Sequence, residues 1–285
     1  MSSRGMILGI GLGVVLLPSL ATAQEWQTLT SRRQYVVEKE LRVDVEFGAG
    51  QIQLEPGAAG ALYEAQIRYD AEVFEPYADY NAESLKVGLK SDGKTKKKLK
   101  EGGRLTLKLG PEVPVDLNLT FGAAEAEIEL GGVRIRNTAI KTGASDTKLR
   151  FSKPNTERME ALVLHAGAAA IHATGLANAN AKRVDVKGGV GDVLLDFTGE
   201  WRGDTEVHVE MGLGSLKLRI PRGVGVRVGK DTFLMSFDSQ ELVKRGNTYY
   251  STDWDKANHR LTIDIGGALG SIEVQWVDGG VRTQD

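Results

Sequence analysis

Two carboxylates, Glu125 and Asp146, occupy equivalent places in neighbouring copies of a repeated segment, three residues after its central glycine. If the copies stack as adjacent strands about 4.8 Å apart, the two carboxylates lie side by side. Glycoside hydrolysis needs two carboxylates about 5 to 10 Å apart, so this pair could cleave a glycan or hold a metal ion. In a nearby column, however, Glu129 is followed one copy on by Arg150, which is typical of a solvated face stabilised by neighbouring charges. We therefore keep Glu125 and Asp146 as weak binding candidates and assign no catalytic or metal-binding residue.

A second candidate is the basic segment KTKKKLK, at residues 94–100, which contains Lys96, Lys97 and Lys98. Such a cluster could bind an anionic polymer, for example a phosphate-rich glycan, or a membrane surface. A solvated hairpin tip explains the same residues, and we favour that interpretation.

Composition excludes several kinds of chemistry. The chain has no cysteine, which rules out a thiol nucleophile, a disulfide framework and a thiolate metal site. Its four histidines show no ligand spacing, and no Gly-x-Ser-x-Gly motif is present. The 36 basic residues are balanced by 38 acidic ones, so we expect no nucleic-acid partner. No cofactor is predicted.

The dominant feature of the sequence is a unit that recurs seven times, with copies such as FGAGQIQL, TGASDTKLRF and MGLGSLKLRI. Residues three and five positions before the anchor, and four and six after it, are almost all apolar, and the residue two after it is small. The anchors are Gly48, Gly122, Gly143, Gly167, Gly189, Gly212 and, in the last copy, Ala268.

This pattern predicts a strand, a sharp bend and a second strand in every unit. Apolar residues two apart mark strands with one buried face, and a glycine followed by a small residue marks close backbone approach or a positive φ. The middle anchors are 21, 24, 22 and 23 residues apart, which corresponds to one coil of a solenoid per unit. The predicted fold is therefore an all-β solenoid with stacked apolar columns. A β-sandwich or meander with similar hairpins is the alternative.

Two longer intervals interrupt the period, 74 residues from Gly48 to Gly122 and 56 residues from Gly212 to Ala268. We interpret them as elaborations that cap the ends of the stack, because a solenoid must cover its last core layer. The predicted organisation is a signal peptide at 1–23, an N-terminal β portion at 24–119, the repeat solenoid at 120–277 and a tail at 278–285.

The N-terminus resembles a secretory signal. Arg4 precedes an apolar run at residues 6–17, and Ala21-Thr22-Ala23 is a typical cleavage site, so the mature chain is expected to begin near Gln24. An uncleaved membrane anchor is the alternative, although the run is shorter than the roughly 20 apolar residues of a spanning helix. We expect no stable membrane span after cleavage.

The stretch VPVDLNLTFGAAEAEIELGGVRI, followed by TGASDTKLRF, resembles the bacterial toast-rack proteins. These are related to the putative-adhesin domains and to the C-terminal domains of cell-wall-active antibiotic response proteins. The resemblance extends to the late stretch GNTYYSTDW before GALGSIEV. It implies a right-handed β-solenoid and a cell-envelope setting, and it brings no catalytic motif.

The expected function is that of an exported, non-enzymatic binding or scaffold protein of the cell envelope, adhesin-like, in the periplasm or at the cell surface. Its expected partner is an envelope protein or a glycan, and the sequence sets no oligomeric state. One alternative is a carbohydrate-active enzyme that uses outer-face carboxylates. Another is an envelope-stress sensing partner of a membrane protein, although the membrane-spanning segments of the proteins with that role are not found here.

Overall fold

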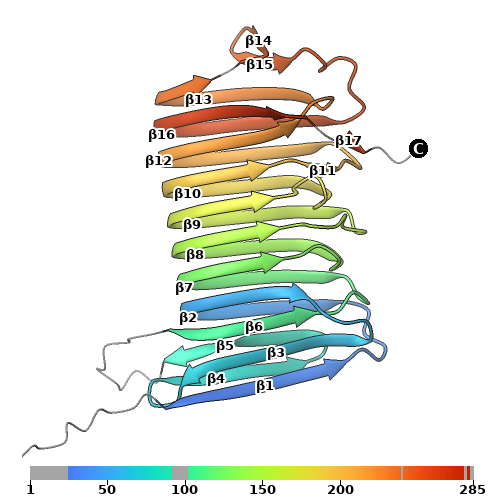
Figure 1. Cartoon of the computed structure of the whole chain (residues 1–285), viewed down its shortest axis with the longest axis vertical. Helices are drawn as coiled ribbons and strands as arrows, with labels where there is room; N and C mark the ends of the chain where they lie inside the picture. Colours follow the sequence, from blue (N-terminus) through green and yellow to red (C-terminus); the bar gives the residue numbers. More distant parts are fainter. Residues whose placement is uncertain (1–24, 92–101, 239, 279–280, 283–285) are drawn as a thin grey trace, which may run out of the picture.

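The computed structural model describes residues 25–91, 102–238, 240–278 and 281–282, which form one long stack of strands without a helix (Figure 1). The bends of the coils lie along one edge of the stack and the connecting turns along the opposite edge (Figure 1). The strands are β1 (Trp26–Gln34), β2 (Leu41–Pro56), β3 (Ala61–Asp70), β4 (Phe74–Asn81), β5 (Ser84–Ser91), β6 (Gly103–Leu109), β7 (Val115–Glu129), β8 (Ile135–Arg150), β9 (Met159–Thr174), β10 (Ala181–Asp196), β11 (Gly199–Glu200), β12 (Thr205–Pro221), β13 (Gly225–Asp238), β14 (Leu242–Arg245), β15 (Thr248–Ser251), β16 (Arg260–Val277) and β17 (Val281–Arg282).

Each repeat unit is one long strand that bends at its anchor and pairs in parallel with the next unit. The seven units lie in the order β2, β7, β8, β9, β10, β12 and β16. Their pairing follows the sequence register: Val45 pairs with Leu119 before the bend, and Ile52 pairs with Ala126 after it. The same offsets hold through every later pair of units. The predicted β-solenoid is therefore confirmed.

Glycine at the bend is required by two kinds of close approach. A Cβ on the anchor Gly143 would lie 2.8 Å from the carbonyl oxygen of Gly122 in the preceding unit. Two residues after the anchor, Gly214 has φ +148°, and a Cβ there would lie 1.8 Å from the carbonyl oxygen of Gly191. Ala169 occupies the same place in β9 without a positive φ. The bend therefore has more than one backbone conformation, and only some units need glycine at the second position.

The interruptions of the period are themselves coils, placed outside the regular ones. β2 and β7 are direct neighbours, and the segment between them supplies β5 and β6, which pair in parallel with the two halves of β2 on its other side. At the opposite end, β16 inserts between β12 and β13, so that β13 forms an outer coil.

Antiparallel strands then cover both ends. β3 pairs with β6, β1 with β3 and β4 with β5, while β15 pairs with β13 and β14 with β15. This arrangement confirms the predicted elaborated N-terminal portion. The division of the chain after residue 119 falls inside β7 and remains a prediction, and residues 1–23 lie outside the described residues.

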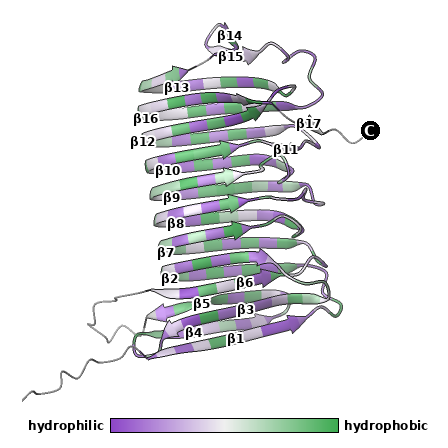
Figure 2. Ribbon diagram, viewed as in Figure 1, coloured by the Kyte–Doolittle hydropathy of each residue, from purple (hydrophilic) through white to green (hydrophobic). Residues whose placement is uncertain are grey.

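A single apolar core runs between the two halves of the coils from Leu41 to Val274. Apolar and polar residues alternate along the strands, which sends one set inward and the other outward (Figure 2). Two threonines interrupt the apolar columns. Thr138 and Thr147 are both 2% exposed, and Thr147 shares a 3.1 Å hydrogen bond with Ser145.

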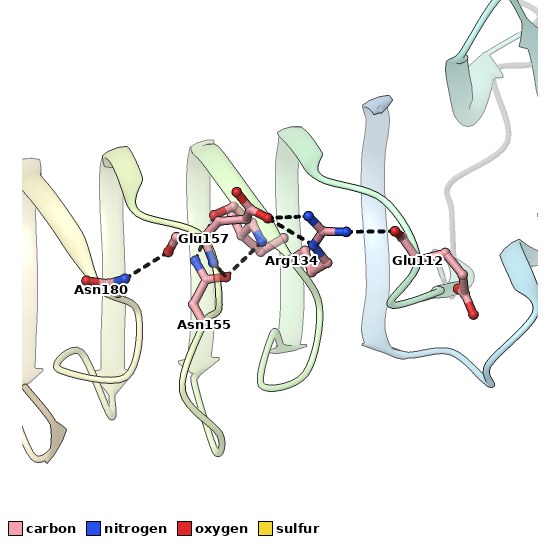
Figure 3. Close-up of polar contacts among 6 residues, drawn as sticks. Glu112, Arg134, Asn155, Glu157 and Asn180 are labelled. Carbon is pink, nitrogen blue, oxygen red and sulfur yellow. Dashed lines mark hydrogen bonds and ion pairs between the residues drawn. The ribbon is translucent and has the colours of Figure 1, made fainter. Parts of the chain in front are cut away.

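Asparagine and arginine side chains join the coils along the turn edge (Figure 3). The buried amide of Asn155 accepts hydrogen bonds from the N–H groups of Ile135 and Glu157, and it donates to the carbonyls of Ile135 and Ala179. Arg134 donates to the Glu112 carbonyl at 2.8 Å and forms an ion pair with Glu157 at 2.6 Å (Figure 3). The polar groups of these turns are thus used in holding neighbouring coils together.

Candidate functional site

The structure brings Glu125 and Asp146 together, as the repeat predicts. They are Cα partners on β7 and β8, and both side chains are exposed. Gln51, on the preceding unit, donates a 3.3 Å hydrogen bond to Glu125 and accepts one of 2.9 Å from Arg104. With Lys148, these residues line a pocket of about 320 Å³ on the outer surface.

The surroundings of the pair are of mixed charge. Arg104 lies on one side of the pocket, and an ion pair of 3.6 Å between Lys148 and Glu127 lies on another. Within the described residues, no group of three or more histidine, cysteine, aspartate or glutamate side chains could hold a metal ion. The geometry therefore offers two adjacent carboxylates in a hollow and leaves their role as a binding site a prediction. Lys96, Lys97 and Lys98 lie outside the described residues.

Elsewhere on the two broad faces, charges are paired from coil to coil. Arg150 lies 2.5 Å from Glu129, which is the neighbour that the register predicts. Further ion pairs of this kind join Arg219 to Asp196 at 2.7 Å, Lys217 to Glu273 at 3.1 Å and Lys182 to Glu160 at 2.6 Å. Exposed pairs of this kind contribute little individually, but they keep like charges apart along the stacked columns.

The histidines join this surface network. His208 lies 3.0 Å from Glu210, and Lys187 lies 3.0 Å from the same carboxylate. These hydrogen bonds, first that of His208 and then that of Lys187, lower the pKa of Glu210. His172 is exposed on β9, as its outward register position predicts.

A further feature, which the sequence analysis missed, lies along the bend edge. The residue directly after each anchor forms an apolar column that we call the bend-edge ridge. In spatial order it consists of Ala49, Ala123, Ala144, Ala168, Val190, Leu213, Leu269 and Leu234. Its four large side chains are strongly exposed, at 52% for Val190, 43% for Leu213, 47% for Leu269 and 61% for Leu234. The signal was present in the copies themselves, in which alanine, valine or leucine follows each anchor.

A shallow groove runs beside the ridge. It has a volume of about 680 Å³, and its floor includes Ala166, Gly188 and Gly267, which leave little side-chain volume. Lys141 and Lys187 stand on its far side. The edge therefore presents a ridge of apolar side chains next to a groove with a basic border.

Comparison with known proteins supplies a family and a set of similar folds. Residues 22–174 match the family model described as the N-terminal domain of toast_rack, DUF2154. A "putative cell adhesion protein" from Clostridium sporogenes has 12% identity and a TM-score of 0.45 over 89% of this chain and 100% of its own. A "putative adhesin" from Bacteroides fragilis has 15% identity and a TM-score of 0.43 over 88% of this chain and 98% of its own. No curated protein matches the sequence. At these identities and TM-scores, the two structures support no inference about function.

Proposed function

From the premise that the chain belongs to the toast-rack family, since more than half of it matches that family's N-terminal domain, we propose that it is an exported, non-enzymatic binding or scaffold protein of the cell envelope with an adhesin-like role. The N-terminal signal supports export. The described part of the chain contains no helix that is long and apolar enough to cross a membrane.

The observation that carries the proposal is the regularity of the outer surface. Outward charges are matched by the coil above or below, as between Arg219 and Asp196, rather than gathered into one site. Catalytic sites instead concentrate titratable groups in a cleft and supply them with a nucleophile, base or metal. A stack of equivalent strands offers long, rigid faces, which suit binding to an extended partner such as a glycan or an envelope protein.

Carbohydrate cleavage is the second candidate, because one specific observation favours it. Glu125 and Asp146 are in register on adjacent strands and line the same pocket, which is the arrangement that a pair of catalytic carboxylates needs.

One experiment separates the two functions. The chain from Gln24 to Asp285 is incubated with peptidoglycan sacculi and with membrane vesicles from the same envelope, and both co-sedimentation and the release of reducing sugars are measured. We expect saturable co-sedimentation with at least one fraction and no sugar release.

The test variant is Glu125→Gln plus Asp146→Asn, and the matched control is Asp192→Asn plus Glu273→Gln, which changes charge equally outside the pocket. Sugar release by the wild type and the control, but not by the test variant, would establish the enzyme instead. Failure to bind any fraction would remove the scaffold proposal.

A further inference from the structure

We propose that the bend-edge ridge is the contact face of a homodimer, in which two copies lie side by side with a two-fold axis parallel to the axis of the solenoid. The inference concerns assembly and goes beyond envelope binding. It is carried by the exposed apolar side chains, the shape of the edge and its charge pattern.

The apolar side chains form a patch rather than isolated surface residues. Val190, Leu213, Leu269 and Leu234 follow one another on adjacent strands, and each is more than two-fifths exposed. Neighbouring strands are about 4.8 Å apart, so the four side chains cover about 14 Å and the whole ridge about 34 Å. Contiguous exposed patches of this kind are typical of interaction surfaces.

The shape of the edge is self-complementary. Beside the ridge, Ala166, Gly188 and Gly267 form the floor of the groove. A two-fold rotation places the ridge of each copy in the groove of the other, so one operation makes both contacts. A partner with a ridge alone would fill only one of the two.

Charge complementarity decides the orientation. Within one coil, Lys141 lies on the groove side of the ridge and Asp146 on the other side, and the next but one coil repeats this with Lys187 and Asp192. A two-fold axis along the solenoid sets the basic border of one copy against the acidic border of the other, coil for coil. An antiparallel arrangement would instead set basic against basic.

The two charges in the middle of the edge are available for this contact. Among the described residues, neither Lys141 nor Asp146 has an ion-pair or hydrogen-bond partner, and both are exposed. Lys187 is shared with Glu210, and Asp192 accepts a 2.5 Å hydrogen bond from Ser215. We therefore expect the pair between Lys141 and Asp146 to contribute most to the orientation. The acidic border also disfavours an anionic lipid surface as the occupant.

The area sets the expected strength. The ridge and its two borders cover roughly 550 Å² per copy, at about 3.3 Å per residue across the bend and 4.8 Å per strand along it. Standard interfaces bury about 800 Å² per partner, so the dimer belongs to the weaker class. We expect a dissociation constant of about 1 μM to 100 μM.

The first test is sedimentation velocity of the chain from Gln24 to Asp285 across that concentration range. Leu213→Asp is expected to weaken the dimer about a hundredfold, because it places a charge in the apolar contact. Val243→Asp, at an exposed apolar residue of β14 outside the ridge, is the matched control and should leave the dimer intact. A wild-type chain that stays monomeric at 500 μM, or a dimer that Leu213→Asp leaves unchanged, would overturn the proposal.

Charge exchange tests the partner and its orientation. Lys141→Asp and Asp146→Lys should each weaken the dimer about tenfold, since each change occurs twice per dimer, and the double exchange should restore it. Unchanged or tighter association of the single variants would contradict the parallel arrangement.

Cross-linking gives an independent readout, because the chain has no cysteine of its own. Leu234→Cys should cross-link to Leu234→Cys of a second copy under a short bismaleimide. An antiparallel dimer centred on the large side chains would join Leu234→Cys to Val190→Cys instead, and that product would overturn the proposal. Wild-type chain that stays monomeric while Leu213→Asp abolishes its binding to phosphatidylglycerol vesicles would identify a lipid occupant and also refute the dimer. Binding to sacculi by a monomeric Leu213→Asp chain would leave the envelope function intact while confirming that the two proposals are separable.

Discussion

Gly214→Ala is the substitution in which the bend geometry has its largest expected effect. The backbone of Gly214 has φ +148°, and an added Cβ would lie 1.8 Å from the carbonyl oxygen of Gly191. The strained conformation costs about 1 to 3 kcal/mol for a residue with a side chain, and relieving the overlap costs about 1 to 3 kcal/mol more. The expected loss is therefore about 2 to 6 kcal/mol, a large part of the 5 to 15 kcal/mol that stabilises an ordinary domain.

Gly48→Ala is the matched control, because an added Cβ at this anchor meets no atom within 4 Å. Its expected effect lies between neutral and a stabilisation of up to about 1 kcal/mol, since alanine restricts the unfolded chain. Urea unfolding, followed by the fluorescence of the buried Trp201, measures both variants. Equal unfolding midpoints for the two variants would refute the close-contact argument.

Three further substitutions test the core, the turn edge and an ionised group. Leu216→Asp places a carboxylate in a column where the native side chain is 1% exposed and should cost several kcal/mol, whereas Glu273→Lys on the outer face should cost well under about 1 kcal/mol; equal thermal shifts would contradict the register. Asn155→Leu leaves backbone groups of neighbouring coils without partners and should cost about 2 to 4 kcal/mol in urea unfolding, and a change below about 0.5 kcal/mol would show that the amide is dispensable. The backbone N–H of Val36, with other donors, lowers the pKa of Glu38 to about 2, so its stabilisation is complete above the usual glutamate pKa of 4.5 and is lost as the pH falls through about 2; Glu38→Gln should flatten acid unfolding between those values, and an unchanged acid limb would contradict this assignment.

The regular part of the fold was predictable because one physical constraint recurs in every unit. A parallel strand stacked in register repeats the same neighbours, so the column of Val45, Leu119 and Ile140 could be deduced from its offsets to the anchors. The pair of Glu125 and Asp146 followed from the same argument.

The outer coils were harder to predict because they lack the anchor. In β5 and β6 the two half-strands are separate, and their alternating apolar residues, among them Val87 and Leu105, pair with the columns of β2 without a glycine between them. In β13 the position beside Ala268 is Phe233. A search based on glycine therefore finds the seven regular units and misses the coils outside them.

The bend-edge ridge and the turn-edge network were missed for different reasons. The residue after each anchor points outward, so a search for buried columns does not examine it, although Val190 and Leu213 are plainly visible in the copies. The turns vary in length and composition, and nothing in their sequence shows that Asn155 reaches the backbone of two other turns. Such contacts depend on the three-dimensional path of the chain.

The central claim is that the columns run without a break across the interruptions, with β7 directly on β2. Gln53 and Glu127 are exposed partners in that pairing, although 74 residues separate them in the sequence. Gln53→Cys plus Glu127→Cys should form a disulfide within the monomer, because adjacent strands place the two Cα atoms about 5 Å apart. Gln53→Cys plus Glu125→Cys, about 8 Å apart in this register, should not form one. A disulfide in the second variant and none in the first, determined by peptide mapping at low protein concentration, would contradict the account.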